Sequence, residues 1–159
     1  MFDQVAERYD LMNGLMSGGQ HLRWRRHTVK AVEASAGQRI LDIAAGTGAS
    51  SVPFADAGAD VVAADLSEGM LAVGRRRRPD ITFVQADVTN LPFEDNEFDA
   101  VTMSYGLRNV ADYPKALREL YRVTKPGGRI VVLEFSTPTI KAFRPLYKNC
   151  LLYTSDAAD

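Results

Sequence analysis

Short apolar runs alternate with longer amphipathic stretches along most of the chain. Five runs rich in Ile, Val, Leu or Ala predict β-strands at residues 39–44, 60–65, 81–85, 98–104 and 129–135. Several of them are almost continuously apolar, which is typical of parallel strands covered on both faces. Helical patterns separate these runs at residues 50–57, 69–77 and 113–123. The alternation predicts an α/β fold with a doubly wound, mostly parallel sheet.

The helix expected over residues 113–123 has the clearest boundaries. Asp112 can cap its N-terminus, and Pro114 is tolerated in the first turn. The sequence Lys-Pro-Gly-Gly at 125–128 should end the helix and turn the chain into the last strand. One apolar face is expected to comprise Ala116, Leu117, Leu120 and Tyr121.

The two ends of the chain lie outside this alternation. Residues 1–35 have helical character with a break at Gly18-Gly19, and we expect them to form an N-terminal helical cap. The last ten residues, CLLYTSDAAD, back-translate into a string that resembles a sequencing-library adaptor. We therefore interpret residues 150–159 as an adaptor-derived tail and residues 1–149 as one domain; an ordinary helix end is the alternative. Without that tail no cysteine remains, so neither a disulfide nor a metal site is expected.

Composition adds mainly exclusions. The 159 residues suit one globular domain, and 46% of them are hydrophobic. A formal net charge of −1 gives no reason to expect nucleic-acid binding. The sequence has no apolar run near the roughly 20 residues of a membrane span, and the charged N-terminus does not look like a signal peptide. These features predict a cytoplasmic protein.

A glycine loop, LDIAAGTGAS, joins the first expected strand to the first helix. Gly46 and Gly48 permit a sharp turn and a close approach of the backbone to a ligand. The next helix presents free N–H groups at its start. Asp65, at the end of the second strand, can accept hydrogen bonds from both ribose hydroxyls of an adenosine cofactor. The alternative is a tight turn without ligand, in which Asp65 only caps the following helix.

Two further positions bear on which class of ligand this loop is expected to bind. A dinucleotide fingerprint wants a third glycine where this chain has Ser51, which weakly disfavours a pyrophosphate ligand and a nicotinamide-dependent oxidoreductase. Asp42 lies inside an apolar strand and must be hydrogen-bonded to be tolerated there. It either holds the glycine loop or contacts the amino group of the cofactor through water.

Several segments together resemble one family. The motif ILDIAAGTG is similar to the first motif of class I methyltransferases. VVAADLSEGMLAVG, QADVTNLPFEDNEFDAVTMSYGLRNV and ALRELYRVTKPGGRIVVLEFSTP resemble the quinone C-methyltransferases of menaquinone and ubiquinone synthesis, closest to actinobacterial demethylmenaquinone methyltransferases. The resemblance implies a Rossmann-like class I fold with S-adenosyl-L-methionine as cofactor. Members close their sheet with two further strands, so the final strands are expected to be missing here, which leaves the fifth strand as an unpaired edge.

The resemblance also implies that Thr47, Asp65, Asp87, Val88 and Ser104 contact the cofactor. The carboxylate of Asp87 could accept from the adenine amino group while Val88 packs on the ring. Ser104 would lie beside the sulfur of the cofactor. A turn-forming aspartate is the alternative for Asp87.

The implied reaction is S-adenosylmethionine-dependent C-methylation of a prenylated quinol, with demethylmenaquinol as the expected substrate and a ubiquinone-pathway benzoquinol as the second. Arg108 and Asn109, just after the fourth strand, are the candidate catalytic residues, because a guanidinium can stabilise a developing phenolate. An arginine paired with a surface acid such as Asp112 is the alternative. A methyltransferase for another small molecule and an inactive cofactor-binding fragment are the competing functions.

Two basic runs, at residues 23–26 and 75–78, could touch anionic lipid headgroups near such a substrate. That would place the protein peripherally at the inner face of a membrane. A solvated charged surface is the competing interpretation of both runs.

Overall fold

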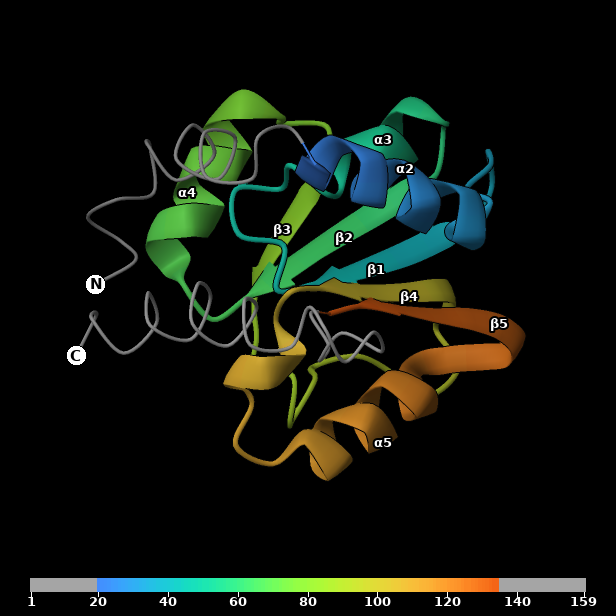
Figure 1. Cartoon of the computed structure of the whole chain (residues 1–159), viewed down its shortest axis with the longest axis vertical. Coiled ribbons are helices and arrows are strands. Elements are labelled where there is room, and N and C mark those ends of the chain that lie inside the picture. The colour runs from blue at the N-terminus through green and yellow to red at the C-terminus, as the bar shows by residue number, and fades with distance from the viewer. Residues whose placement is uncertain (1–19, 135–159) are drawn as a thin grey trace, which may run out of the picture.

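The structure is a computed structural model that describes residues 20–134, with side chains from residue 26 onward. Its centre is a five-stranded parallel sheet in the order β3-β2-β1-β4-β5 (Figure 1). The strands are β1 (Arg39–Ile43), β2 (Asp60–Asp65), β3 (Thr82–Gln85), β4 (Phe98–Ser104) and β5 (Thr124–Leu133). The expected parallel α/β sheet is therefore confirmed.

Helices cover both faces of this sheet. Three of them, α2 (Gln20–Val32), α3 (Val52–Asp56) and α4 (Glu68–Arg77), lie on one face, and α5 (Tyr113–Val123) lies on the other (Figure 1). A single 3-10 turn, η1 (Leu107–Asn109), follows β4. Residues 86–97 connect β3 to β4 without a helix.

The core follows the two-residue period of the strands. Along β1, Ile40 packs into the cluster beneath α2, α3 and α4, whereas Leu41 and Ile43 pack into the cluster beneath α5. All three side chains are at most 4% exposed. Full burial of such a side chain contributes about 1.5–3 kcal/mol. The near-continuous apolar strands of the sequence are explained by this double coverage.

The expected boundaries hold within two residues except at the start of β5, which begins at Thr124 rather than at residue 129. Thr124 already pairs with Phe98, and Arg129 pairs with Ala100, so the residues between form a bulge. A Cβ on Gly128 would lie 2.8 Å from the carbonyl oxygen of Asp99. The Lys-Pro-Gly-Gly segment therefore does not precede the last strand but lies within it.

The prediction of one apolar face on α5 is wrong for two of its four members. Ala116 and Leu120 are fully buried, but Leu117 is 40% exposed and Tyr121 is 77% exposed. The helix contacts the sheet through Ala116, Leu120 and Val123, a narrow stripe at i, i+4 and i+7. The capping prediction is confirmed: the Asp112 side chain accepts from the Lys115 N–H at 3.0 Å.

The expected N-terminal cap can be followed only from residue 20, where α2 begins. This helix packs beside β5, and Arg129 joins the two by donating to the Val32 carbonyl at 3.0 Å and pairing with Glu33 at 2.6 Å. Residues 1–19, Phe135, at the end of the fifth expected strand, and the expected tail at 150–159 lie outside the described residues. Within residues 20–134 no helix is long and apolar enough to cross a membrane.

Candidate functional site

A cavity of about 360 Å³ opens where the strand order reverses, beside the carboxyl ends of β1, β2 and β4. Its volume falls within the roughly 300–1,000 Å³ of small-molecule sites. In open α/β sheets ligands bind at this switch point, because the loops after adjacent strands diverge there. The loop after β1 and the turn after β4 form much of its wall.

The glycine loop adopts the sharp turn that its sequence predicts. Gly46 and Gly48 have φ angles of 57° and 81°, and Ala44 has φ 55°. Gly46 lines the cavity, and a Cβ there would lie 2.9 Å from Cε of Met70. A Cβ on Gly48 would lie 2.7 Å from Cζ of Phe83. The two glycines thus differ in role: Gly46 borders the cavity, and Gly48 packs against β3.

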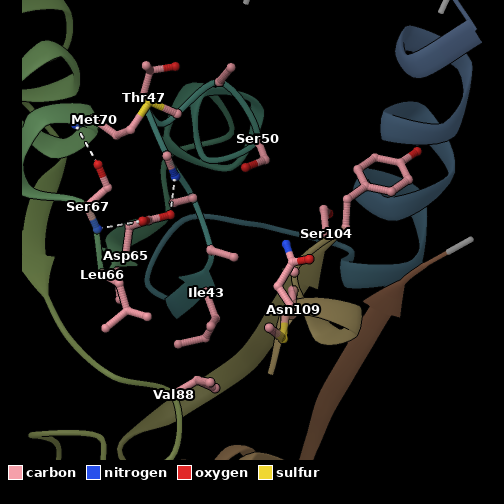
Figure 2. Close-up of a pocket in the computed structure, with 18 of the residues that line it drawn as sticks. Ile43, Thr47, Ser50, Asp65, Leu66, Ser67, Met70, Val88, Ser104 and Asn109 are labelled. Carbon is pink, nitrogen blue, oxygen red and sulfur yellow. Dashed lines mark hydrogen bonds between the residues drawn. The ribbon is translucent and has the colours of Figure 1, made fainter. Parts of the chain in front are cut away.

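Asp65 joins the loops after β1 and β2. Its Oδ2 accepts from the Gly46 N–H and its Oδ1 from the Ser67 N–H, each at 2.9 Å (Figure 2). Ser67 in turn caps α4 by accepting from the Met70 N–H at 3.3 Å. The partly exposed carboxylate lines the cavity. A carboxylate oxygen can accept two hydrogen bonds, so each oxygen has capacity for a ligand hydroxyl as well.

Asp42 lies beneath the loop and is fully buried. Its Oδ2 accepts from the hydroxyls of Ser50 and Ser51, each at 2.7 Å, and its Oδ1 from Thr102 at 3.3 Å. These contacts fit the loop-holding alternative of the two that the sequence left open. Ser51, at the third-glycine position of a dinucleotide fingerprint, is likewise fully buried and occupied with Asp42.

Three of the other cofactor candidates line the cavity, whereas Asp87 is not among the residues that line it. Thr47, on the glycine loop, and Val88, after β3, both line it and are 6% and 7% exposed. Ser104 lines it from the end of β4, across from Asp65 (Figure 2). Asp87 is exposed, and its Oδ1 accepts from both the N–H and the hydroxyl of Thr89 at 2.8 Å. These bonds lower the pKa of Asp87 below its ordinary value, with the backbone N–H as the larger cause.

The two catalytic candidates occupy the 3-10 turn η1 but face differently. Asn109 lines the cavity near Ser104 (Figure 2). The half-exposed guanidinium of Arg108 pairs with Oε1 of Glu134 at 2.6 Å, and the Arg108 N–H donates to Oε2 at 3.1 Å. The ion pair expected as the alternative therefore exists, with Glu134, directly after β5, rather than with Asp112.

Comparison with known proteins gives this arrangement a family. The model of the ubiE/COQ5 methyltransferase family matches residues 1–154. The chain belongs to this family. It is 62% identical over 152 residues to the demethylmenaquinone methyltransferase of Renibacterium salmoninarum, covering 96% of this chain and 64% of that protein. It is 59% identical over 152 residues to the enzyme of the same name from Paenarthrobacter aurescens, covering 96% of this chain and 60% of that protein.

The fold agrees with that of solved class I methyltransferases. The crystal structure of a candidate S-adenosyl-L-methionine-dependent methyltransferase from Methanococcus maripaludis superposes with a TM-score of 0.72 at 22% identity, covering 98% of this chain and 74% of that one. The chain spans about three fifths to two thirds of the length of the curated relatives it matches.

Leu66, Thr28 and Tyr105 are among the cavity residues of this ubiE/COQ5 family chain that were not predicted from the sequence. Leu66, directly after Asp65, is 65% exposed at the cavity although it is apolar. The sequence could have indicated Leu66, because it lies between Asp65, at the end of a strand, and Ser67, which caps the next helix. Thr28 reaches the cavity from α2, and Tyr105 does so from a left-handed turn with φ 58°. No local pattern marks either of them.

Two arginines of the basic run at residues 75–78 of this family member are engaged in ion pairs. Arg75 pairs with Glu68, and Arg78 pairs with Asp56 at 2.9 Å and Asp80 at 2.7 Å. Side chains of residues 23–25 lie outside the described part. In the described residues no cluster of His, Cys, Asp and Glu could hold a metal ion.

Proposed function

We propose that this chain binds S-adenosyl-L-methionine in the switch-point cavity and methylates a ring carbon of demethylmenaquinol to give menaquinol. The observation that carries the proposal is the Asp65 carboxylate, which lines the cavity while joining the glycine loop to the start of α4. Membership of the ubiE/COQ5 family, with relatives named demethylmenaquinone methyltransferase, supports the reaction class.

In this proposal, each part of the cofactor would contact a different set of residues in or beside the cavity. Asp65 has acceptor capacity for the two ribose hydroxyls. Leu66 and Val88 offer apolar surface on either side of an adenine ring. Asp87, whose Oδ1 takes both Thr89 donors, would use Oδ2 for the adenine amino group. Thr47 and Ser104 would contact the methionine part and the region of the sulfur.

When bound, the cofactor supplies an electrophilic methyl group on a sulfonium. The work left for the protein is to align the ring carbon with that methyl group and to exclude water. Asn109 lines the cavity and can orient a quinol hydroxyl by hydrogen bonding. Arg108 does not line the cavity in the structure and pairs with Glu134, so it would have to turn from this carboxylate toward the substrate. There it would stabilise the phenolate that forms when the hydroxyl loses its proton, which makes the neighbouring ring carbon electron-rich.

The substrate and place of action follow from this reaction. The partner molecule is a prenylated quinol, and we propose a cytoplasmic protein that works at the inner membrane surface, where such a lipid is found. A ubiquinone-pathway benzoquinol is the second substrate to test. No observation in the described residues favours another class of function.

The test is a binding titration followed by a product analysis. The 159-residue chain should bind S-adenosylhomocysteine and not NADH in calorimetry. Incubation with methyl-labelled S-adenosylmethionine and demethylmenaquinol should give label on a ring carbon. Label on an oxygen, or transfer only to an unrelated small-molecule acceptor, would refute the quinol assignment. Binding of NADH in preference to S-adenosylhomocysteine would refute the cofactor assignment.

A further inference from the structure

Arg122, in the last turn of α5, uses all five of its N–H donors on described partners. Its Nε and Nη2 donate to the two carboxylate oxygens of Glu119 at 2.7 and 2.9 Å. Its Nη1 donates to Oδ1 of Asp95 and to the Phe93 carbonyl, each at 2.8 Å, and its Nη2 also reaches the Leu91 carbonyl at 3.1 Å. Three of these four partners belong to the connection between β3 and β4.

Glu119 completes the contact by binding the other backbone group of the same residue, Leu91. Its Oε2 accepts from the Leu91 N–H at 2.8 Å, so both backbone groups of Leu91 are bound by the pair. The carboxylate side chain of Glu119 is 17% exposed and the guanidinium side chain of Arg122 is 31% exposed. A two-point Arg–carboxylate pair fixes orientation as well as distance. The pair therefore holds a specific backbone conformation at Leu91.

The connection held in this way also carries part of the cavity wall. Residues 86–97 contain no helix that could fix them internally. Val88 lines the cavity and, like Leu91, is buried in the cluster beneath α5. Asp87 and Asn90 close a short turn between the end of β3 and Leu91. In this turn the Asn90 N–H donates to the Asp87 carbonyl at 2.9 Å. The position of Asp87 and Val88 thus depends on how Leu91 is anchored.

We propose that Arg122 and Glu119 are positioning residues that set the adenine side of the cofactor cavity by fixing residues 87–91 against α5. This inference rests on the proposed function, because it takes the cavity as the S-adenosylmethionine site. Neither side chain lines the cavity. Their effect is to hold the Asp87 carboxylate where it distinguishes an amino group from a carbonyl on the purine.

The test compares S-adenosylhomocysteine with S-inosylhomocysteine, which carries a carbonyl in place of the adenine amino group. The unmodified chain should prefer the adenosyl compound about 10- to 100-fold, the range of one charge-assisted hydrogen bond. In Arg122→Ala this preference should fall to less than about threefold. Arg122→Lys keeps the charge but offers three donors instead of five. It should fold, pair with Glu119 and still lose most of the preference.

A matched control is Arg78→Ala. Arg78 is also a semi-buried arginine with two carboxylate partners, but it links the end of α4 to Asp56 and Asp80, and none of these three residues lines the cavity. This variant should lower the melting temperature and leave the adenosyl preference unchanged. An unchanged preference in folded Arg122→Lys, or an equal loss in Arg78→Ala, would overturn the positioning role. If the unmodified chain binds neither compound, the proposed function fails and this role fails with it.

Discussion

Replacement of Asp65 by asparagine tests the centre of the proposed site. The change keeps the shape of the side chain and one oxygen, but turns the other acceptor into an amide donor. That amide would face either the Gly46 N–H or the Ser67 N–H, both of which the carboxylate now accepts at 2.9 Å. Asp65→Ala removes both oxygens.

The expected magnitude follows from the bonds lost. Two ribose hydroxyls bound by a carboxylate contribute about 1.5–3 kcal/mol each. Their joint loss in Asp65→Ala should weaken S-adenosylhomocysteine binding by about 10²- to 10⁴-fold, because 1.4 kcal/mol corresponds to a factor of ten. In Asp65→Asn the loss of one of these contacts should cost about 10- to 100-fold.

Isothermal titration calorimetry measures these affinities. An analogue of S-adenosylhomocysteine without ribose hydroxyls distinguishes the loss of a direct contact with Asp65 from an indirect effect of a disturbed glycine loop. If Asp65 binds the ribose, the unmodified chain loses affinity on removal of the hydroxyls and the Asp65→Asn variant loses much less. Asp60→Asn is the matched control, because Asp60 begins the same strand and pairs with Arg39 at 3.3 Å away from the cavity. Equal hydroxyl dependence in Asp65→Asn and in the unmodified chain would refute the reasoning.

Three further results are expected. Gly48→Ala should lower stability by about 1–3 kcal/mol through overpacking against Phe83, and in thermal melts it should cost more than Gly127→Ala, which has a similar positive φ but no atom within 4 Å of an added Cβ. Arg108→Ala should reduce kcat for quinol methylation about 10²- to 10³-fold with little change in S-adenosylhomocysteine affinity; a fall in affinity alone would contradict its catalytic role. The neighbouring guanidinium lowers the pKa of Glu119 below its ordinary value of 4.5, so its contribution to stability is present above about pH 4.5 and lost as the pH falls through the folded pKa. In urea titrations the stability difference between the unmodified chain and Glu119→Gln should therefore shrink in acid, and a constant difference would contradict this linkage.

The sheet could be predicted from the sequence because its strands are buried on both faces. The bounds of β2 and β4 match the expected runs, since each is apolar along most of its length and ends at a polar side chain. The glycine loop could be predicted because its turn needs left-handed residues. The alternation of apolar and polar residues along a strand does not indicate a bulge. The predicted start of β5 is therefore too late in the sequence.

The parts of the site that escaped prediction depend on distant contacts. Thr28 borders the cavity only because α2 packs beside β5, which lies about a hundred residues further along the chain. The partner of Arg108 is Glu134, across the sheet end, rather than the nearby Asp112. Leu117 and Tyr121 looked like core residues by spacing, but α5 buries a narrower stripe. Spacing along one helix does not reveal how wide its buried face is.

The helix-free connection at residues 86–97 has a consequence for the order of folding. Its anchors on Glu119 and Arg122 lie 28 to 31 residues away from the backbone groups they bind. Such contacts can form only after the intervening β4 and α5 have closed the loop, which delays them relative to local structure. The glycine loop and Asp65, only 19 residues apart, can come together earlier. We therefore expect the contact between Asp65 and the glycine loop to form before the cavity wall at Val88 is fixed.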